Sequence, residues 1–182
     1  MKKTVWTFGL ISGGVIAALM LLALPFHDAI GFDRGYVVGY TTMVLAFLFI
    51  YFGVRSYRDN VGNGSVSFGR ALAIGSLIAV ISSLCYTATW EVIYFGGLMP
   101  DFSAKYQAYE VGKLKASGAS QAEIDRQAAD LQRFSEMYKN PAINAALTFI
   151  EPFPVGLVIA LVSAGILRKK REDGPGQVAV AV

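Results

Sequence analysis

Two acidic side chains lie well inside long apolar stretches of this 182-residue chain. They are Glu91 and Glu151, and the second is followed closely by Pro152 and Pro154. An ionised side chain at the centre of a membrane helix costs about 2.5–3.5 kcal/mol on insertion scales. Each glutamate therefore needs a hydrogen-bonding partner, water or a proton, and both are candidates for binding a proton or another cation.

The two prolines predict a break in the helix next to Glu151. Proline has no backbone N–H, so Pro152 and Pro154 leave the carbonyl groups of Thr148 and Ile150 without their helical donors. Broken helices with buried acids are typical of ion and substrate sites in transporters. The alternative is structural: each glutamate is protonated or hydrogen-bonded and only holds its helix in register. The candidate partners are Tyr86, Thr87, Tyr94 and Asn144.

Long apolar stretches must position these side chains. At 1.5 Å per residue, each can cross a hydrocarbon core of about 30 Å. Hydrophobic residues make up 54% of the chain and charged residues 16%, which is unusual for a soluble domain. The sequence predicts an all-α fold, an integral membrane four-helix bundle, in which both glutamates lie about 10 Å below the outer surface and could face one another. The four predicted spans are residues 6–24, 36–54, 71–98 and 142–167.

Basic residues predict the orientation of the spans. They cluster at three ends of the spans, which the positive-inside rule assigns to the cytoplasm, whereas the segments 25–35 and 100–140 are balanced in charge. We expect four crossings of a bacterial cytoplasmic (inner) membrane, with both termini inside. Residues 6–24 are too long for the apolar region of a signal peptide, about 7–15 residues, and are interpreted as a retained helix. The clustered basic residues are Lys2, Lys3, Arg55, Arg58, Arg70, Arg168, Lys169, Lys170 and Arg171.

The polar insertion, residues 100–140, is predicted to form two amphipathic helices outside the membrane. Ser120 and Glu123 have the spacing of a capping box, which marks the start of the second helix. One interpretation is a packed hairpin that shields the mouth of the bundle, and the other is a surface that docks a partner. Residues 1–172 would then form a single membrane domain, followed by a disordered tail at 173–182.

Small residues recur every four positions in three of the predicted spans. Such ridges let membrane helices approach closely. The pattern alone leaves open whether they pack within one chain or between copies. The ridges are Gly9 and Gly13, then Gly75, Ala79 and Ser83, then Gly156, Ala160 and Ala164.

Groups for other chemistry are few. His27 is the only histidine and Cys85 the only cysteine, so one chain cannot assemble a histidine-based zinc site, a Ser-His-Asp triad or a disulfide. A phosphate-binding loop of the GxxxxGK type is absent, and the basic residues are not interleaved with aromatic ones as in nucleic-acid-binding proteins. We expect no enzyme activity, no catalytic residues, no metal, no cofactor and no nucleic-acid partner.

Two motifs carry a resemblance to a known family. Residues 67–75 have the pattern Ser-Phe-x-x-Ala-Leu-x-x-Gly, and residues 151–156 have Glu-Pro-x-Pro-Val-Gly. In a chain of this size these motifs resemble the bacterial family called domain of unknown function 4199, over the region from about Val5 to Lys170. The resemblance implies a small four-helix inner-membrane protein with an external insertion before the last span. It implies no activity, because none is established for that family.

Two functional hypotheses follow. The favoured one is a non-enzymatic membrane protein that acts through contacts with the lipid bilayer and with a membrane-protein partner or a second copy of the chain. The alternative is a small proton- or cation-coupled transporter that uses Glu91 and Glu151. A water-accessible cavity that reaches both glutamates from the outer side would favour transport, whereas a dry, packed pair would count against it.

Overall fold

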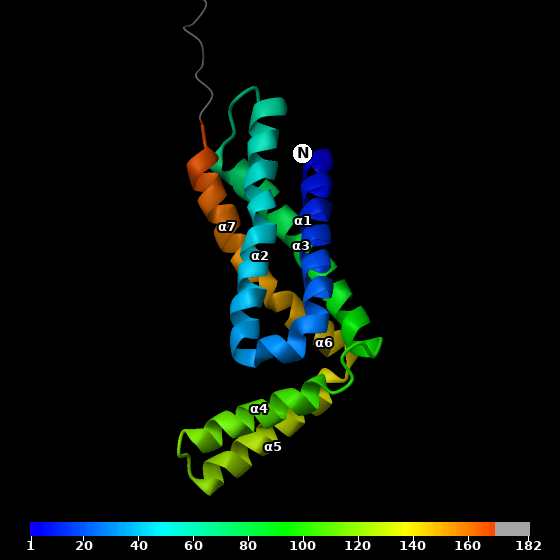
Figure 1. Ribbon diagram of the computed structural model, residues 1–182. Coiled ribbons are helices and arrows are strands. Elements are labelled where there is room, and N and C mark those ends of the chain that lie inside the picture. Colours follow the sequence, from blue (N-terminus) through cyan, green and yellow to red (C-terminus); the bar gives the residue numbers. More distant parts are fainter. Residues whose placement is uncertain (170–182) are drawn as a thin grey trace, which may run out of the picture.

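The computed structural model describes residues 1–169, which fold into helices (Figure 1). In this part of the chain the only β-type pairing is an isolated bridge between Val66 and Lys169, so the all-α prediction is confirmed there. The predicted basic residues Lys170 and Arg171 and the predicted tail lie outside the described residues. The elements are α1 (Lys2–Ala23), the 3-10 turn η1 (Leu24–Phe26), α2 (His27–Asn60), α3 (Phe68–Phe95), α4 (Phe102–Ala116), α5 (Gln121–Tyr138), α6 (Pro141–Ile150) and α7 (Pro152–Leu167).

Three helical stretches are long and apolar enough to cross a membrane: Lys2–Asn60, Phe68–Phe95 and Pro141–Leu167. The first contains α1 and α2, which pack against each other because the chain turns back between them (Figure 1). The link predicted at 25–35 is helical for most of its length. Its exception is Gly31, whose φ of 70° and ψ of 167° lie in a region open essentially to glycine alone.

Helices α1, α2, α3 and α7 form the bundle, with α3 packed against both α1 and α7. Its core is made of large side chains with no exposed surface, among them Phe47, Ile50 and Ile78. Many other large apolar side chains point outward and remain exposed, for example Val37 at 68% and Ile166 at 65%. An apolar exterior on long apolar helices is the surface that a lipid bilayer accommodates, which indicates a membrane protein.

Small residues set the closest helix contacts within the chain. A methyl group added at Gly75 would lie 2.8 Å from Cβ of Ala160, and one added at Gly156 would lie 2.8 Å from Cβ of Ala79. These four residues form the seam between α3 and α7. Gly13 of α1 approaches α3 in the same way, since an added methyl would lie 2.6 Å from the nearest α3 side chain. The ridges therefore pack within one chain, which resolves the alternative that the sequence left open.

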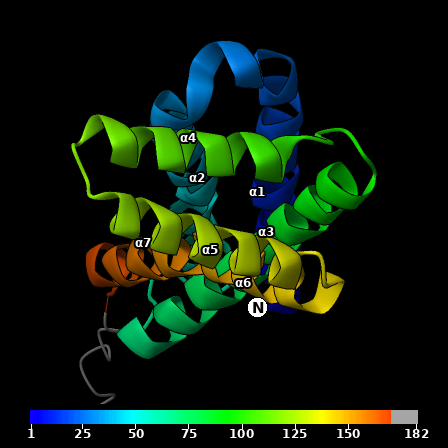
Figure 2. The same cartoon turned by 90° about the horizontal axis from the view of Figure 1, so that it is seen from below.

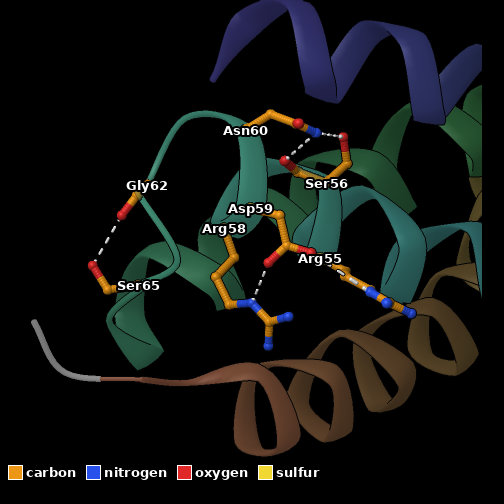
Figure 3. A network of polar contacts seen from close by, with 7 residues as sticks. All are labelled: Arg55, Ser56, Arg58, Asp59, Asn60, Gly62 and Ser65. Carbon is orange, nitrogen blue, oxygen red and sulfur yellow. Dashed lines mark hydrogen bonds and ion pairs between the residues drawn. The ribbon is translucent and has the colours of Figure 1, made fainter.

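A polar link joins α2 to α3 at the end of the bundle that holds the N-terminus (Figure 1). Arg58 Nε donates a hydrogen bond of 2.7 Å to Asp59 Oδ1, and Arg55 Nε lies 3.6 Å from the other carboxylate oxygen (Figure 3). Ser65 Oγ donates to the carbonyl of Gly62 at 2.9 Å and closes the turn. The basic side chains are thus tied into local structure on the face away from the insertion.

Candidate functional site

Glu151 lies where the last helical stretch is interrupted. α6 ends at Ile150 and α7 begins at Pro152, so the break falls at Glu151. Glu151 keeps helical backbone angles, with φ of −65° and ψ of −58°, and the chain therefore continues in nearly the same direction. Proline is favourable in the first turn of a helix because the missing N–H has no helical acceptor there. The break leaves the carboxylate beside carbonyl groups that have lost their donors.

The Glu151 carboxylate has one hydrogen-bonding partner among the described residues. Tyr86 Oη on α3 donates to Glu151 Oε2 at 3.0 Å. Tyr86 was one of the partners predicted from the sequence. Glu151 itself remains exposed, so its other oxygen is free to contact a ligand or water.

Glu151 lines a cavity of about 310 Å³ at the end of the bundle near the hairpin α4–α5. Residues of α1 to α6 contribute to its walls, and most of the lining is apolar or aromatic. Glu151 is the only acidic residue among the lining residues of the described chain, and no lysine or arginine lines it. The aromatic lining includes Tyr40, Tyr86, Trp90, Phe102, Tyr106 and Tyr138.

A chain of hydrogen bonds ties the end of α5 to α3 and α6 beside this cavity. Trp90 Nε1 donates to Tyr138 Oη at 2.9 Å, and Thr148 Oγ1 donates to Asn144 Oδ1 at 3.1 Å. The hydroxyls of Tyr138 and Thr148 are 3.0 Å apart, and because the threonine proton is already used, the tyrosine is the donor. Burial raises the pKa of Tyr138, so its proton stays in place at neutral pH. The chain fixes one wall of the cavity.

The hairpin lies across this end of the bundle (Figure 2). Its first helix is held to the start of α2 by Lys105, whose Nζ lies 2.8 Å from both carboxylate oxygens of Asp28. One turn further along α4, Tyr109 donates a hydrogen bond to Asp33, and this bond raises the pKa of the Tyr109 hydroxyl. The predicted capping box at the start of α5 is also present, with Glu123 accepting from the Ser120 backbone at 2.9 Å. The hairpin thus contributes Phe102, Tyr106 and Tyr138 to the wall of the cavity.

A family model described as "Protein of unknown function (DUF4199)" matches residues 7–169. The chain belongs to this family. Comparisons with curated proteins and with solved structures found no match. The family description states no activity, so the function of this DUF4199 protein must be argued from its own geometry.

Glu91, the second predicted candidate, is not part of the cavity of this DUF4199 protein. It follows Trp90 on α3 and therefore points about 100° away from that cavity-lining residue. One of its oxygens, Oε1, is buried without a hydrogen-bonding partner among residues 1–169. The structure does not bring the two glutamates together.

α3 ends at Phe95 rather than at 98, and the turn beyond it contains Gly97 with a φ of 73°. Among the described residues, no hydrogen bond joins Glu91 to Glu151. The equal depth of the two glutamates stays a prediction.

The aromatic walls of the DUF4199 cavity were not predicted from the sequence. They come from four helices that are distant in the chain, including α4 of the insertion. The one available signal was the amphipathic character of the insertion, for which a packed hairpin and a partner-docking surface were both left open. Among the described residues, no group of three or more histidine, cysteine or acidic side chains could hold a metal ion.

Proposed function

We propose that this DUF4199 protein crosses a bacterial cytoplasmic membrane four times, with both termini in the cytoplasm and the hairpin outside. The crossings are α1, α2, α3 and the joined α6 and α7. One support is the packing of α1 against α2. The other is that the three basic segments lie at one end of the bundle, since Val66 of the α2–α3 link pairs with Lys169 after α7 at the end where the N-terminus lies (Figure 1). Positive charge on one side of the membrane favours a cytoplasmic location for that side.

The orientation is tested by labelling single cysteines in a Cys85→Ser background. Ser117→Cys, at the exposed tip of the hairpin, should react with a membrane-impermeant maleimide in intact cells. Asn63→Cys, in the exposed link between α2 and α3, should react only after the membrane is permeabilised. The reverse pattern would contradict the proposed orientation.

We further propose that the protein moves a proton or another cation across the membrane and that Glu151 is the residue that carries it. The observation behind this proposal is the position of Glu151, which is exposed in a cavity where residues 1–169 contribute no other acidic side chain and no lysine or arginine. A carboxylate next to an interrupted helix, with carbonyl groups freed by prolines, offers oxygen atoms to a cation in a cavity with mostly apolar and aromatic walls. The cavity reaches Glu151 and not Glu91, so the geometry supports transport through this one carboxylate and not through a pair.

The experiment compares proton and monovalent-cation flux in proteoliposomes that contain the wild type, Glu151→Gln or Glu91→Gln. Glutamine keeps the shape of the side chain and its bond to Tyr86 but cannot carry a proton or balance a positive charge. We expect flux in the wild type, its loss in Glu151→Gln and its retention in Glu91→Gln. Equal flux in all three proteins would refute the role of Glu151, and its loss in both variants would restore the earlier hypothesis of a paired site.

Contact with another membrane component is the second candidate function, and the hairpin supports it. No residue of α4 is buried, and only Ile124 of α5 is, so most of the hairpin surface is free. The small-residue ridges are used inside the chain, which leaves the hairpin as the surface for a membrane-protein partner or a second copy. A photo-crosslinking amino acid at the 43% exposed Phe134 should then give one discrete product in membranes, whereas the same group at Ser117 should not. The absence of any product at Phe134 would contradict this function.

Neither proposal involves catalysis, a cofactor or nucleic acid. Both are consistent with the scarcity of reactive groups in the sequence.

A further inference from the structure

We infer that the cavity binds an organic cation, a molecule with one ammonium group on an apolar or aromatic body. This inference rests on the proposed function and specifies the class of cation that Glu151 accepts. It depends on the charge, the walls and the size of the cavity.

The charge of the cavity selects a cation. Glu151 is the one carboxylate on its lining, and the hydrogen bond from Tyr86 occupies only Oε2. Lys105 of the hairpin is paired with Asp28 and does not line this cavity. His27 also lines the cavity, and its Nδ1 lies 3.5 Å from Asp28 Oδ1. An anion would meet an unbalanced carboxylate here, whereas an ammonium group would neutralise it.

The walls select an organic cation over a metal ion. Hard metal cations take six or more oxygen ligands, whereas the lining offers one carboxylate and a few hydroxyl groups besides the carbonyl groups freed at the helix break. Aromatic faces, in contrast, attract ammonium groups within about 6 Å of the ring centroid. Trp90, Phe102 and Tyr106 form a continuous aromatic wall, since the ring centroids of Trp90 and Phe102 are 5.1 Å apart and those of Phe102 and Tyr106 are 6.3 Å apart.

The size of the cavity fits such a ligand. A volume of about 310 Å³ lies at the lower end of the range for small-molecule pockets, which is roughly 300–1,000 Å³. A single inorganic ion would leave most of the apolar wall in contact with water. A ligand with an aromatic ring and a small ammonium group can cover that wall and still reach Glu151.

The test measures equilibrium binding of radiolabelled benzyltrimethylammonium to the purified full-length chain in detergent. Competition with neopentylbenzene, its neutral isostere, separates charge from shape. We expect saturable binding to the wild type, a loss of at least tenfold in affinity in Glu151→Gln, little change in Glu91→Gln and no effective competition by the isostere. Equal binding by Glu151→Gln, or equal competition by the isostere, would overturn the inference.

A second pair of variants keeps the test decisive if Glu151→Gln fails to fold. Tyr106→Phe keeps the aromatic ring and loses the hydroxyl with its 3.4 Å contact to Tyr36, whereas Tyr106→Leu also loses the ring. We expect Tyr106→Phe to bind like the wild type and Tyr106→Leu to bind about two- to thirtyfold more weakly, the range of a cation–π contact. Equal affinity of these two variants would contradict an aromatic cation site.

The outcomes also separate this inference from the proposed transport. Cation or proton flux that depends on Glu151 without ammonium binding would leave transport standing and overturn the inference. Ammonium binding that depends on Glu151 without any flux would support the inference and overturn transport, leaving a membrane protein that binds an organic cation without moving it.

Discussion

A methyl group placed in the seam between α3 and α7 tests the packing on which the cavity depends. In Gly156→Ala the new Cβ would lie 2.8 Å from Cβ of Ala79 and 3.3 Å from the ring of Phe47. Carbon atoms in contact prefer about 3.5–4.0 Å, so the methyl pair is about 1 Å too close. Cβ of Ala79 is fixed by its backbone and Phe47 is fully buried, so the two helices must move apart.

The magnitude follows from two opposing effects. Overpacking of this kind costs about 1–3 kcal/mol, and replacing a helical glycine by alanine returns about 0.5–1 kcal/mol of conformational free energy. Gly165→Ala is the matched control on the same helix, because nothing lies within 4 Å of its added methyl. Since the helix-propensity gain is common to both variants, the difference in their unfolding free energies should equal the overpacking cost, about 1–3 kcal/mol.

The assay is reversible unfolding in mixed micelles of dodecylmaltoside and SDS, followed by far-ultraviolet circular dichroism. Gly156→Ala should unfold at a lower SDS fraction than the wild type and Gly165→Ala should not. The double variant Gly156→Ala/Ala79→Gly should recover most of the loss, because it moves the methyl group from one side of the seam to the other. If the unfolding free energies of the two single variants differed by less than about 0.5 kcal/mol, the usual agreement between independent sites, this account of the seam would be refuted.

Two further predictions concern the hairpin. Hydrogen bonding to Asp33 raises the pKa of Tyr109, so this contact is fully present below the ordinary tyrosine pKa near 10 and is lost as the pH rises through the raised value. The distance between spin labels on α4 and α2 should therefore lengthen above pH 10 in the wild type. Tyr109→Phe should show no such step. Removing the Tyr138 hydroxyl in Tyr138→Phe leaves the Trp90 N–H without its acceptor and Thr148 without its donor, which should lower the unfolding free energy by about 1–3 kcal/mol in the same micelle assay. An unchanged free energy would show that the hydrogen-bond chain does not hold the hairpin.

Local patterns in the sequence were sufficient for several features of the structure. The capping box of Ser120 and Glu123 and the helix break at Glu151 depend on residues within a few positions of each other. Backbone donors and acceptors at such short range are decided by the neighbouring residues, so these features could be predicted. The all-helical fold followed from apolar stretches long enough to span a bilayer.

Other features depended on how distant segments pack. The sequence could not tell that Gly31 alone interrupts the long helix α2, because glycine is compatible with both helical and left-handed backbone. It could not decide whether the small-residue ridges face one another within the chain either, since that requires the register of α3 against α7.

The sequence by itself determined which residues are exceptional: two carboxylates in apolar helices, one of them beside two prolines. Only the tertiary structure decided that Glu151 faces a cavity with Tyr86 while Glu91 points elsewhere. The physical reason is that the 100° step between successive helical residues fixes directions only relative to the helix itself. Which of these directions leads into the cavity depends on the neighbouring helices, including those of the hairpin, which form part of its wall.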